Sequence, residues 1–212
     1  PNRTYRFVVW ADFVKQGTQD DLCYDTTDLN AITRKSVVAM DECQDAYFIQ
    51  KDLFVGGTGI SESLILKRPF GKIRVITTDY DEVNIGSEPE KVEVKFYNHK
   101  LFTTLNAVTG VANGETINEY TYNITKESSP YTQGYDEVEQ NMTLFADYIL
   151  AADETVGAQE VNFTIEVTGK DGRVINSHDF NTQIPLERNH LTTIVGNLLT
   201  LQNDITISID DN

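Results

Sequence analysis

The chain has 212 residues, 40% of them hydrophobic and 10% aromatic, which is enough to build a sizeable core in one large or two small domains. Its 17 basic and 33 acidic side chains give a formal net charge of −16. Charge of this sign repels nucleic-acid phosphates and anionic lipid, so the composition argues against a nucleic-acid partner and predicts a well-solvated surface.

The chain opens on PNRTYRFVVW, in which Arg3 and Arg6 are not followed by the apolar segment of a signal peptide. No later stretch approaches the ~18 consecutive apolar residues of a transmembrane helix. We therefore expect that any export signal has been removed or that the chain is a fragment.

The two cysteines, Cys23 and Cys43, both lie in the first quarter of the chain. In an exported protein they could form a single disulfide, and two buried free thiols are equally compatible with the sequence. Two thiols alone cannot build a metal site, and they leave the compartment open.

Period-2 alternation dominates the chain and predicts a mostly β fold. In VNFTIEVTG every second residue from Val161 to Val167 is apolar, as in a half-buried antiparallel strand. The turn GKDG and the stretch RVINSHDF continue it as a β-hairpin. ITISID repeats the rule and predicts that Ile205, Ile207 and Ile209 point inward. We expect further strands at TYRFVVWADFV, SLILKRPF, GKIRVITTD, KVEVKFYN, EYTYNIT and MTLFADYIL.

Helical signals are few. Residues 103–108 could form a short helix. The stretch HLTTIVGNLLT has apolar residues at helical spacing, but its β-branched run and Gly196 favour a strand. Short strands with turn residues between them are typical of β-sandwiches.

Pro69 separates two strand-like runs and predicts a domain boundary near residues 68–71. The chain then divides into an N-terminal β domain, residues 1–68, and a C-terminal β-sandwich domain, residues 69–212. The first would hold only about 70 residues, which is small for an independent sandwich. We therefore expect that domain to be incomplete at its start.

Motifs of catalysis or cofactor binding are absent from the sequence. GGTGIS lacks the lysine of a phosphate loop and the third glycine of a dinucleotide turn, and neither G-x-S-x-G nor H-E-x-x-H occurs. His99, His178 and His190 are scattered, without the spacing of shared metal ligation. We predict no catalytic residue, no cofactor and no metal.

Two polar clusters remain to be interpreted. TTDYDEVNIGSEPE carries carboxylates from Asp79 onward and loosely resembles a calcium loop, but it lacks the EF-hand glycine, so we interpret it as a solvated acidic loop. In IPLERNHLTT, Arg188 and His190 have no acid–nucleophile partner at readable spacing, and we expect them to hydrogen-bond the turn before a strand.

Several stretches together resemble a known family: YRFVVWADFV, DLCYDTTDLNAI, DAYFIQKD, LKRPFGKIRVITTD and IPLERNHLTTIVGNLLT. In this order they resemble the fimbrillin-like proteins of Bacteroidales, the subunits and relatives of type V pili. The resemblance covers nearly the whole chain, and WAD, LKRPF and RNHLTTIVGNLLT are its most specific parts.

The resemblance implies two antiparallel β-sandwich domains of transthyretin-like, Greek-key topology in a protein exported as an outer-membrane lipoprotein. It further implies assembly by β-strand addition, in which a strand of one subunit fills a groove in the next. The lipid-attachment cysteine and the first strands of the family are not in this chain, so outer-membrane attachment would depend on a missing N-terminal anchor. A role as anchor, tip or non-polymerising relative is as compatible as a role in the pilus shaft.

These observations lead to a non-enzymatic structural or adhesion protein of the cell surface, with other fimbrial subunits or host surface ligands as partners. The alternative is a surface module that binds a glycan or protein without polymerising, for which Tyr131 and Tyr135 in SSPYTQGYDE are the candidate interaction loop. A third hypothesis, a hydrolase, requires His178 or His190 to meet carboxylates in space.

Overall fold

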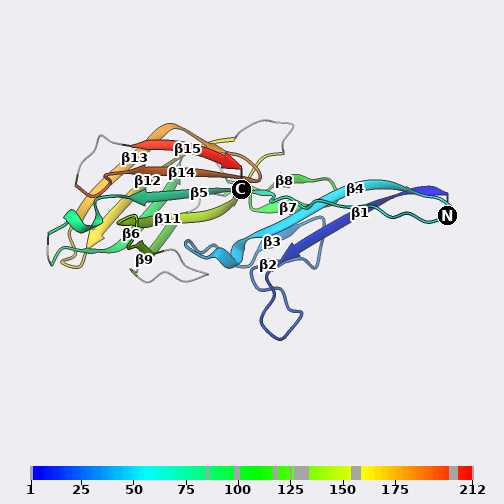
Figure 1. Cartoon of the computed structure of the whole chain (residues 1–212), viewed down its shortest axis with the longest axis horizontal. Helices are drawn as coiled ribbons and strands as arrows, with labels where there is room; N and C mark the ends of the chain where they lie inside the picture. The colour runs from blue at the N-terminus through cyan, green and yellow to red at the C-terminus, as the bar shows by residue number, and fades with distance from the viewer. Residues whose placement is uncertain are drawn as a thin grey trace.

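Strands make up nearly all the regular structure in the computed structural model of this protein. The structure describes residues 2–84, 86–97, 101–116, 119–124, 126, 134–153, 159–200 and 205–211. Figure 1 shows a broad body of packed strands, from which β1 (Arg3–Asp12) and β4 (Ala46–Val55) project as a long ribbon. The predicted all-β class is confirmed.

The body is a sandwich of two sheets. One sheet contains, in spatial order, β10 (Tyr135–Asp136), β11 (Asn141–Leu150), β5 (Phe70–Thr77), β14 (His190–Gly196) and β15 (Thr206–Asp211). The other contains β13 (Val174–Leu186), β12 (Gln159–Gly169), β6 (Pro89–Tyr97) and β9 (Glu119–Asn123). Neighbouring strands are antiparallel except β5 and β14, which run parallel.

The sandwich core is filled by alternate residues of the two sheets. The inward residues of β12 are buried as the alternation predicts: Val161, Phe163, Ile165 and Val167. The ring centroid of Phe163 lies 5.1 Å from that of Phe96 on β6 and 4.9 Å from that of Phe180 on β13. Aromatic pairs at such distances add to the stabilisation from burial, so the contacts of Phe163 stabilise the packing of β12 with β6 and β13.

Two expectations about local structure are confirmed. The β12–β13 hairpin forms, with Gly172 at φ +77° in its turn, where a glycine is not strained. The ambiguous HLTTIVG stretch is strand β14, because its β-branched side chains pack between two neighbouring strands.

The inward orientation predicted for the isoleucines of β15 is wrong. Ile205, Ile207 and Ile209 are 36–40% exposed. β15 lies at the edge of its sheet, pairs with β14 on one side, and contributes no residue to the buried core cluster. Alternation predicted the strand correctly, but it cannot show whether a second layer covers the apolar face.

The short helix predicted at residues 103–108 is also wrong. β7 (Thr104–Asn106) pairs there with β8 (Val111–Asn113). The side-chain oxygen of Asn106 accepts hydrogen bonds from the backbone N–H groups of Val108 and Thr109, each at 3.0 Å. Asparagine thereby stabilises a turn in competition with a helix, and Gly110 at φ +75° completes it.

The N-terminal part packs around a second, smaller core. β2 (Tyr24–Asp25) and β3 (Ile32–Arg34) join β7 and β8 in a four-stranded sheet, and the short 3₁₀ helix η1 (Glu42–Gln44) precedes β4. A second 3₁₀ helix, η2 (Tyr80–Glu82), follows β5. The second core contains Tyr24, Ile32, Ala46, Phe70, Leu105, Ala107, Tyr148 and Leu150.

Hydrogen bonds between β3 and β7 cross the predicted boundary near residue 68. The second core likewise combines residues from both sides of that boundary. These contacts show that the two parts pack together, and they do not test whether each part is a separate domain. The division into domains 1–68 and 69–212 stays a prediction.

We predict that Phe163→Ala lowers the free energy of unfolding by about 3–5 kcal/mol, because it leaves a cavity at the centre of the aromatic chain. Chemical denaturation measures the change. Val174→Ala on β13, where the side chain is 53% exposed, serves as the control and should stay within about 0.5 kcal/mol of the native protein. Equal losses in the two variants would contradict this account of the core.

Candidate functional site

The β1–β4 ribbon has two different faces. Side chains alternate along a strand, so Val8 and Trp10 on β1 share one face and pack against the second core. The opposite face, called here the outer face, carries Tyr5, Phe7 and Val9 of β1 beside Leu53, Lys51 and Ile49 of β4. Phe7 and Val9 are each more than one third exposed, so the outer face presents apolar surface to solvent.

β1 is also an open edge. Among the described residues its one strand partner is β4, with ten residue pairs in register from Arg3↔Val55 to Asp12↔Ala46. The outer edge of β4 is partly covered, because Phe48 pairs with Lys67 through two main-chain hydrogen bonds of 2.9 and 3.1 Å. Within the part of the chain that the structure describes, the N–H and C=O groups on the outer edge of β1 thus have no strand partner, and another strand could pair with them.

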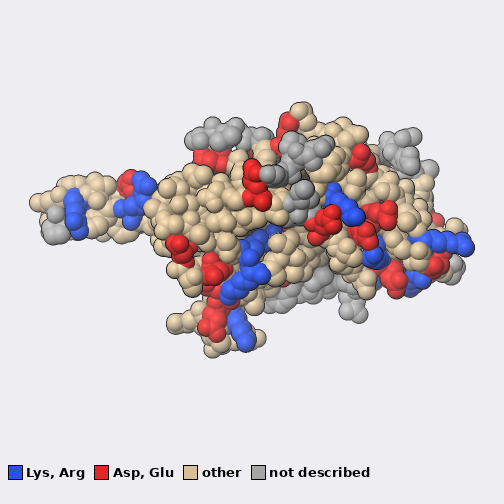
Figure 2. Space-filling model, turned by 180° about the vertical axis from the view of Figure 1, so that it is seen from behind, with Lys and Arg blue, Asp and Glu red and all other residues tan. Residues whose placement is uncertain are grey.

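Figure 2 shows the molecule from behind, with the ribbon extending as a narrow projection. Charged side chains gather at two places on the visible surface of this projection, and most of its other coloured atoms belong to uncharged residues. One of its ion pairs joins Arg6 to Asp52 at 2.6 Å across the two strands. Exposed pairs of this kind contribute little to stability.

The small N-terminal sheet is joined to the sandwich by a buried ion pair. Arg34 on β3 donates from both terminal nitrogens to the Asp147 carboxylate on β11, at 3.1 and 2.9 Å, and also to the carbonyl of Tyr148 at 2.9 Å. The two side chains are 9% and 1% exposed. Burial by itself disfavours the charge of Arg34, but the charge and hydrogen bonds of Asp147 outweigh it, so the pKa of Arg34 is raised.

Asp147 also accepts a hydrogen bond from a third strand. The hydroxyl of Tyr120 on β9 donates to the same carboxylate, so one buried acid links β3, β9 and β11. Sequence reasoning missed this pair, although a charged residue within the apolar run LFADYIL is a signal that could have found it.

Two further ion pairs surround the junction. Lys72 on β5 donates to both carboxylate oxygens of Glu42 on η1 at 2.6 Å, and the Tyr148 hydroxyl donates to Glu42 at 2.7 Å. Arg68 donates to the two oxygens of Asp45 at 2.7 and 2.8 Å. Burial lowers the pKa of Lys72 by more than Glu42 raises it. Each pair joins the segment before β4 to the start of the sandwich, which orients the ribbon.

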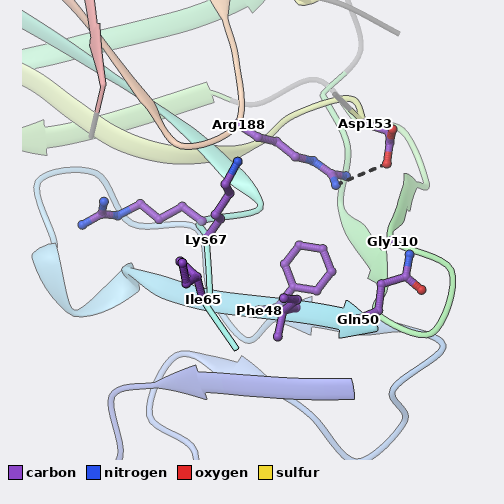
Figure 3. Close-up of a pocket in the computed structure, with 9 residues that line it drawn as sticks. Phe48, Gln50, Ile65, Lys67, Gly110, Asp153 and Arg188 are labelled. Atoms are coloured by element: carbon purple, nitrogen blue, oxygen red, sulfur yellow. Dashed lines mark ion pairs between the residues drawn. The ribbon is translucent and has the colours of Figure 1, made fainter. Parts of the chain in front are cut away.

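A pocket of about 310 Å³ lies at this junction. Figure 3 shows the Phe48 ring below the side chain of Arg188, with Lys67 and Ile65 on one side and Gln50 and Gly110 on the other. The guanidinium carbon of Arg188 lies 5.8 Å from the Phe48 ring centroid. Arg188 pairs with Asp153 at 3.7 Å and donates from Nε to the carbonyl of Ala151 at 3.0 Å. The pocket therefore combines cationic, aromatic and amide groups from three separate segments.

The interpretation of residues 77–90 as a solvated acidic loop is wrong for Asp79, which is 1% exposed. Its carboxylate accepts hydrogen bonds from the backbone N–H groups of Leu199 and Thr200 and from the Thr200 hydroxyl, at 2.7–3.2 Å. The Thr77 hydroxyl donates to it as well. Burial raises the pKa of Asp79, but these donors lower it by more, so the net pKa lies below its ordinary value.

Two of the three histidines, His178 and His190, lie within the described residues. His178 is buried and bonds the carbonyl of Leu198 at 2.7 Å. His190 bonds the carbonyl of Arg188 at 2.8 Å, as expected for the turn, and its other ring nitrogen lies 3.0 Å from Asp211. The side chain of Arg188 donates from Nε to the carbonyl of Ala151. His99 lies outside the described residues.

The remaining candidate residues stay predictions. Cys23 and Cys43 are both half-buried free thiols in the structure. Burial, with smaller contributions from neighbours that include Cys43, raises the pKa of Cys23 to about 11, so its thiol is not activated. A bridge between these two residues remains an expectation for oxidising conditions.

Of the candidate interaction loop, Tyr131 lies outside the described residues. The Tyr135 hydroxyl donates to Asp81, which raises the pKa of Tyr135 to about 12. The Lys126 ammonium lies over the Tyr135 ring, 4.8 Å from its centroid, and covers part of the aromatic face.

Within the described residues, no group of three or more His, Cys, Asp or Glu side chains is placed to hold a metal ion. The described part of the chain also holds no helix with the length and apolarity that a membrane crossing requires.

The fold and its surface define an all-β protein with a sandwich body and an exposed two-stranded ribbon. The chain belongs to the family of unknown function DUF6562, whose family model matches residues 1–212. A search of the curated proteins found no match.

Solved structures of Bacteroides proteins show a distant likeness. A proposed cell adhesion protein from Bacteroides ovatus is 15% identical, with a TM-score of 0.49 over 100% of this chain and 69% of that one. One from Bacteroides uniformis is 15% identical, with a TM-score of 0.47 over 99% and 73%. A proposed adhesin from Bacteroides thetaiotaomicron is 11% identical, with a TM-score of 0.48 over 100% and 76%. At TM-scores below 0.5 these likenesses leave the function of the chain open.

We predict that Arg34→Met lowers the free energy of unfolding by about 3–5 kcal/mol, because it leaves the Asp147 carboxylate buried without its cation. Chemical denaturation measures the loss. The double variant Arg34→Met/Asp147→Leu should recover part of it, since no buried charge remains. A loss in Arg34→Met below about 1 kcal/mol, as at an exposed pair, would contradict the assignment.

Asp79 predicts a dependence of stability on pH. Because its folded pKa lies below the unfolded value of about 3.9, its contribution is present above pH 4 and is lost as the pH falls through the folded pKa. Asp79→Asn should cost about 1–3 kcal/mol at pH 7, and the difference from the native protein should shrink below about pH 4. Unfolding curves measured from pH 7 to pH 3 check this, with the exposed Asp20→Asn as control. A difference that is constant across this range would show that the Asp79 charge contributes nothing.

Proposed function

We propose that the protein is a non-enzymatic structural or adhesion protein of the cell surface, related to fimbrillin-like pilus subunits, and that it assembles with its partners by β-strand addition. The single observation that carries the proposal is the open edge that β1 has among the described residues, in a ribbon whose outer face exposes Phe7 and Val9. Two-stranded ribbons are marginally stable by themselves in water, and a third strand would extend both the hydrogen bonding and the buried apolar surface.

The sequence of β1 supports its role as the accepting edge. Edge strands are commonly protected from pairing by proline, lysine or a charge at mid-strand. RTYRFVVWAD contains no proline or lysine, and no charge interrupts it between Arg6 and Asp12. By contrast, β15 at the edge of the sandwich ends in Asp210 and Asp211. The less protected edge is therefore the one on the ribbon.

Chemical cross-linking of intact source cells tests this assembly. A membrane-impermeant cross-linker should join the native protein into species of higher mass. Phe7→Lys/Val9→Lys, which places two charges on the outer face, should reduce these species about tenfold or more, because the added surface would cover charged side chains in place of apolar ones.

Val174→Lys is the matched control, since it adds a charge at an exposed valine of the sandwich. Thermal unfolding establishes that all variants fold. Equal cross-linking in the double variant, or a location confined to the cytoplasm, would contradict the proposal.

The second candidate function is a surface module that binds a glycan or a protein without polymerising. The pocket at the junction of ribbon and sandwich favours it, because polar groups converge there around an aromatic ring.

A further inference from the structure

We propose that the strand that adds to the open edge of β1 is β1 of a second copy of this chain, antiparallel about a two-fold axis at Val8. The inference rests on the proposed function, strand addition at β1, and names the partner of that edge. The product is a continuous sheet of two ribbons, in the order β4, β1, β1 and β4. Both copies then present the same surface to each other, as in the commonest symmetric dimers.

The main-chain groups at the open edge of β1 belong to alternate residues. On β4, Phe48 directs both its N–H and its C=O to Lys67, away from β1. Residues of an antiparallel pair alternate in this respect, and the β1–β4 register runs without a shift. Trp10, which lies opposite Phe48, therefore directs its own N–H and C=O away from β4. The residues of β1 that face the open edge in this way are Thr4, Arg6, Val8, Trp10 and Asp12.

The open edge is uninterrupted over most of β1. Among the described residues, and apart from the pairing with β4, the first main-chain hydrogen bond after the start of β1 is at Phe13, whose carbonyl accepts from Leu22 at 3.2 Å. An antiparallel copy about Val8 joins the outward-facing residues to one another, so each such pair can exchange two main-chain hydrogen bonds. The resulting pairs are Val8 with Val8, Arg6 with Trp10 and Thr4 with Asp12.

The charges along β1 select this register. Pairing about Arg6 would place two guanidinium groups opposite each other, and pairing about Phe7 would leave them diagonal neighbours on one face. Pairing about Val8 separates the two arginines and brings Asp12 of the second copy to the diagonal position beside Arg6. The basic residues Arg3 and Arg6 lie in the first half of β1 and the acid Asp12 lies at its end, so an antiparallel copy is complementary in charge.

The same register joins the apolar parts of the two outer faces. Phe7 of each copy lies opposite Val9 of the other, and these side chains are 37% and 36% exposed in the single chain. Both residues direct their main-chain groups to β4, so across the axis they form non-hydrogen-bonded pairs, in which side chains approach most closely. Their burial would stabilise the dimer together with the main-chain hydrogen bonds.

Sedimentation equilibrium of the isolated protein tests the inference, at concentrations up to about 0.5 mM because a single strand pair buries less than a standard interface. The native protein should form a dimer in a concentration-dependent manner. Phe7→Lys/Val9→Lys places like charges opposite each other twice and should weaken this dimer about tenfold or more. Phe7→Glu/Val9→Lys places a carboxylate opposite an ammonium twice and should dimerise about tenfold more tightly than the like-charge variant.

Both double variants lose the same two apolar side chains, so the difference between them isolates the sign of the charges across the axis. Thermal unfolding verifies the fold, and Val174→Lys, at an exposed valine of the sandwich, should leave the dimer unchanged. A native protein that stays monomeric, or equal dimerisation of the two double variants, would overturn the pairing of β1 with itself. Reduced cross-linking of Phe7→Lys/Val9→Lys on cells would then still support strand addition, with another protein as partner.

Discussion

The buried pair of Arg34 and Asp147 is the interaction on which the arrangement of the molecule depends. Asp147 lies in β11, a strand that contributes to both hydrophobic cores, and its carboxylate binds Arg34 of the small N-terminal sheet and Tyr120 of the opposite sheet of the sandwich. A buried charge is costly unless it is paired and hydrogen-bonded, so the carboxylate requires all of these elements in place. The pairs Lys72–Glu42 and Arg68–Asp45 repeat this arrangement at the start of the sandwich.

This junction gives the protein its two candidate interaction surfaces. Figure 1 shows the β1–β4 ribbon projecting from the rest of the molecule. Its outer face exposes Phe7 and Val9, and among the described residues β4 is the one strand that pairs with β1. The junction also brings β4, the Lys67 segment and the turn before β14 together around the pocket in Figure 3. Neither surface belongs to the sandwich alone.

Much of the fold could be predicted from the sequence, because side-chain alternation is a local consequence of strand geometry. It correctly predicted β12, the β12–β13 hairpin and the strand at β14. Alternation failed where the burial of a residue depends on which other segment packs against it. The isoleucines of β15 alternate like those of a core strand, but the strand lies at an edge. The sequence around Asp79 resembles a solvated acidic loop. In the structure, however, the backbone N–H groups of Leu199 and Thr200, far along the chain, donate hydrogen bonds to its carboxylate. The pocket was not predicted at all, since Phe48, Lys67 and Arg188 lie far apart in the chain.

By itself the sequence determined the all-β class, the position of most strands and an acidic surface, because these properties follow from composition and from spacing over a few residues. Tertiary structure alone decided which apolar faces are covered, which acids are buried and which strand edge stays open. The physical reason is that burial and pairing depend on what packs against a residue. In this chain the partners that matter, such as Arg34 and Asp147, are separated by more than a hundred positions.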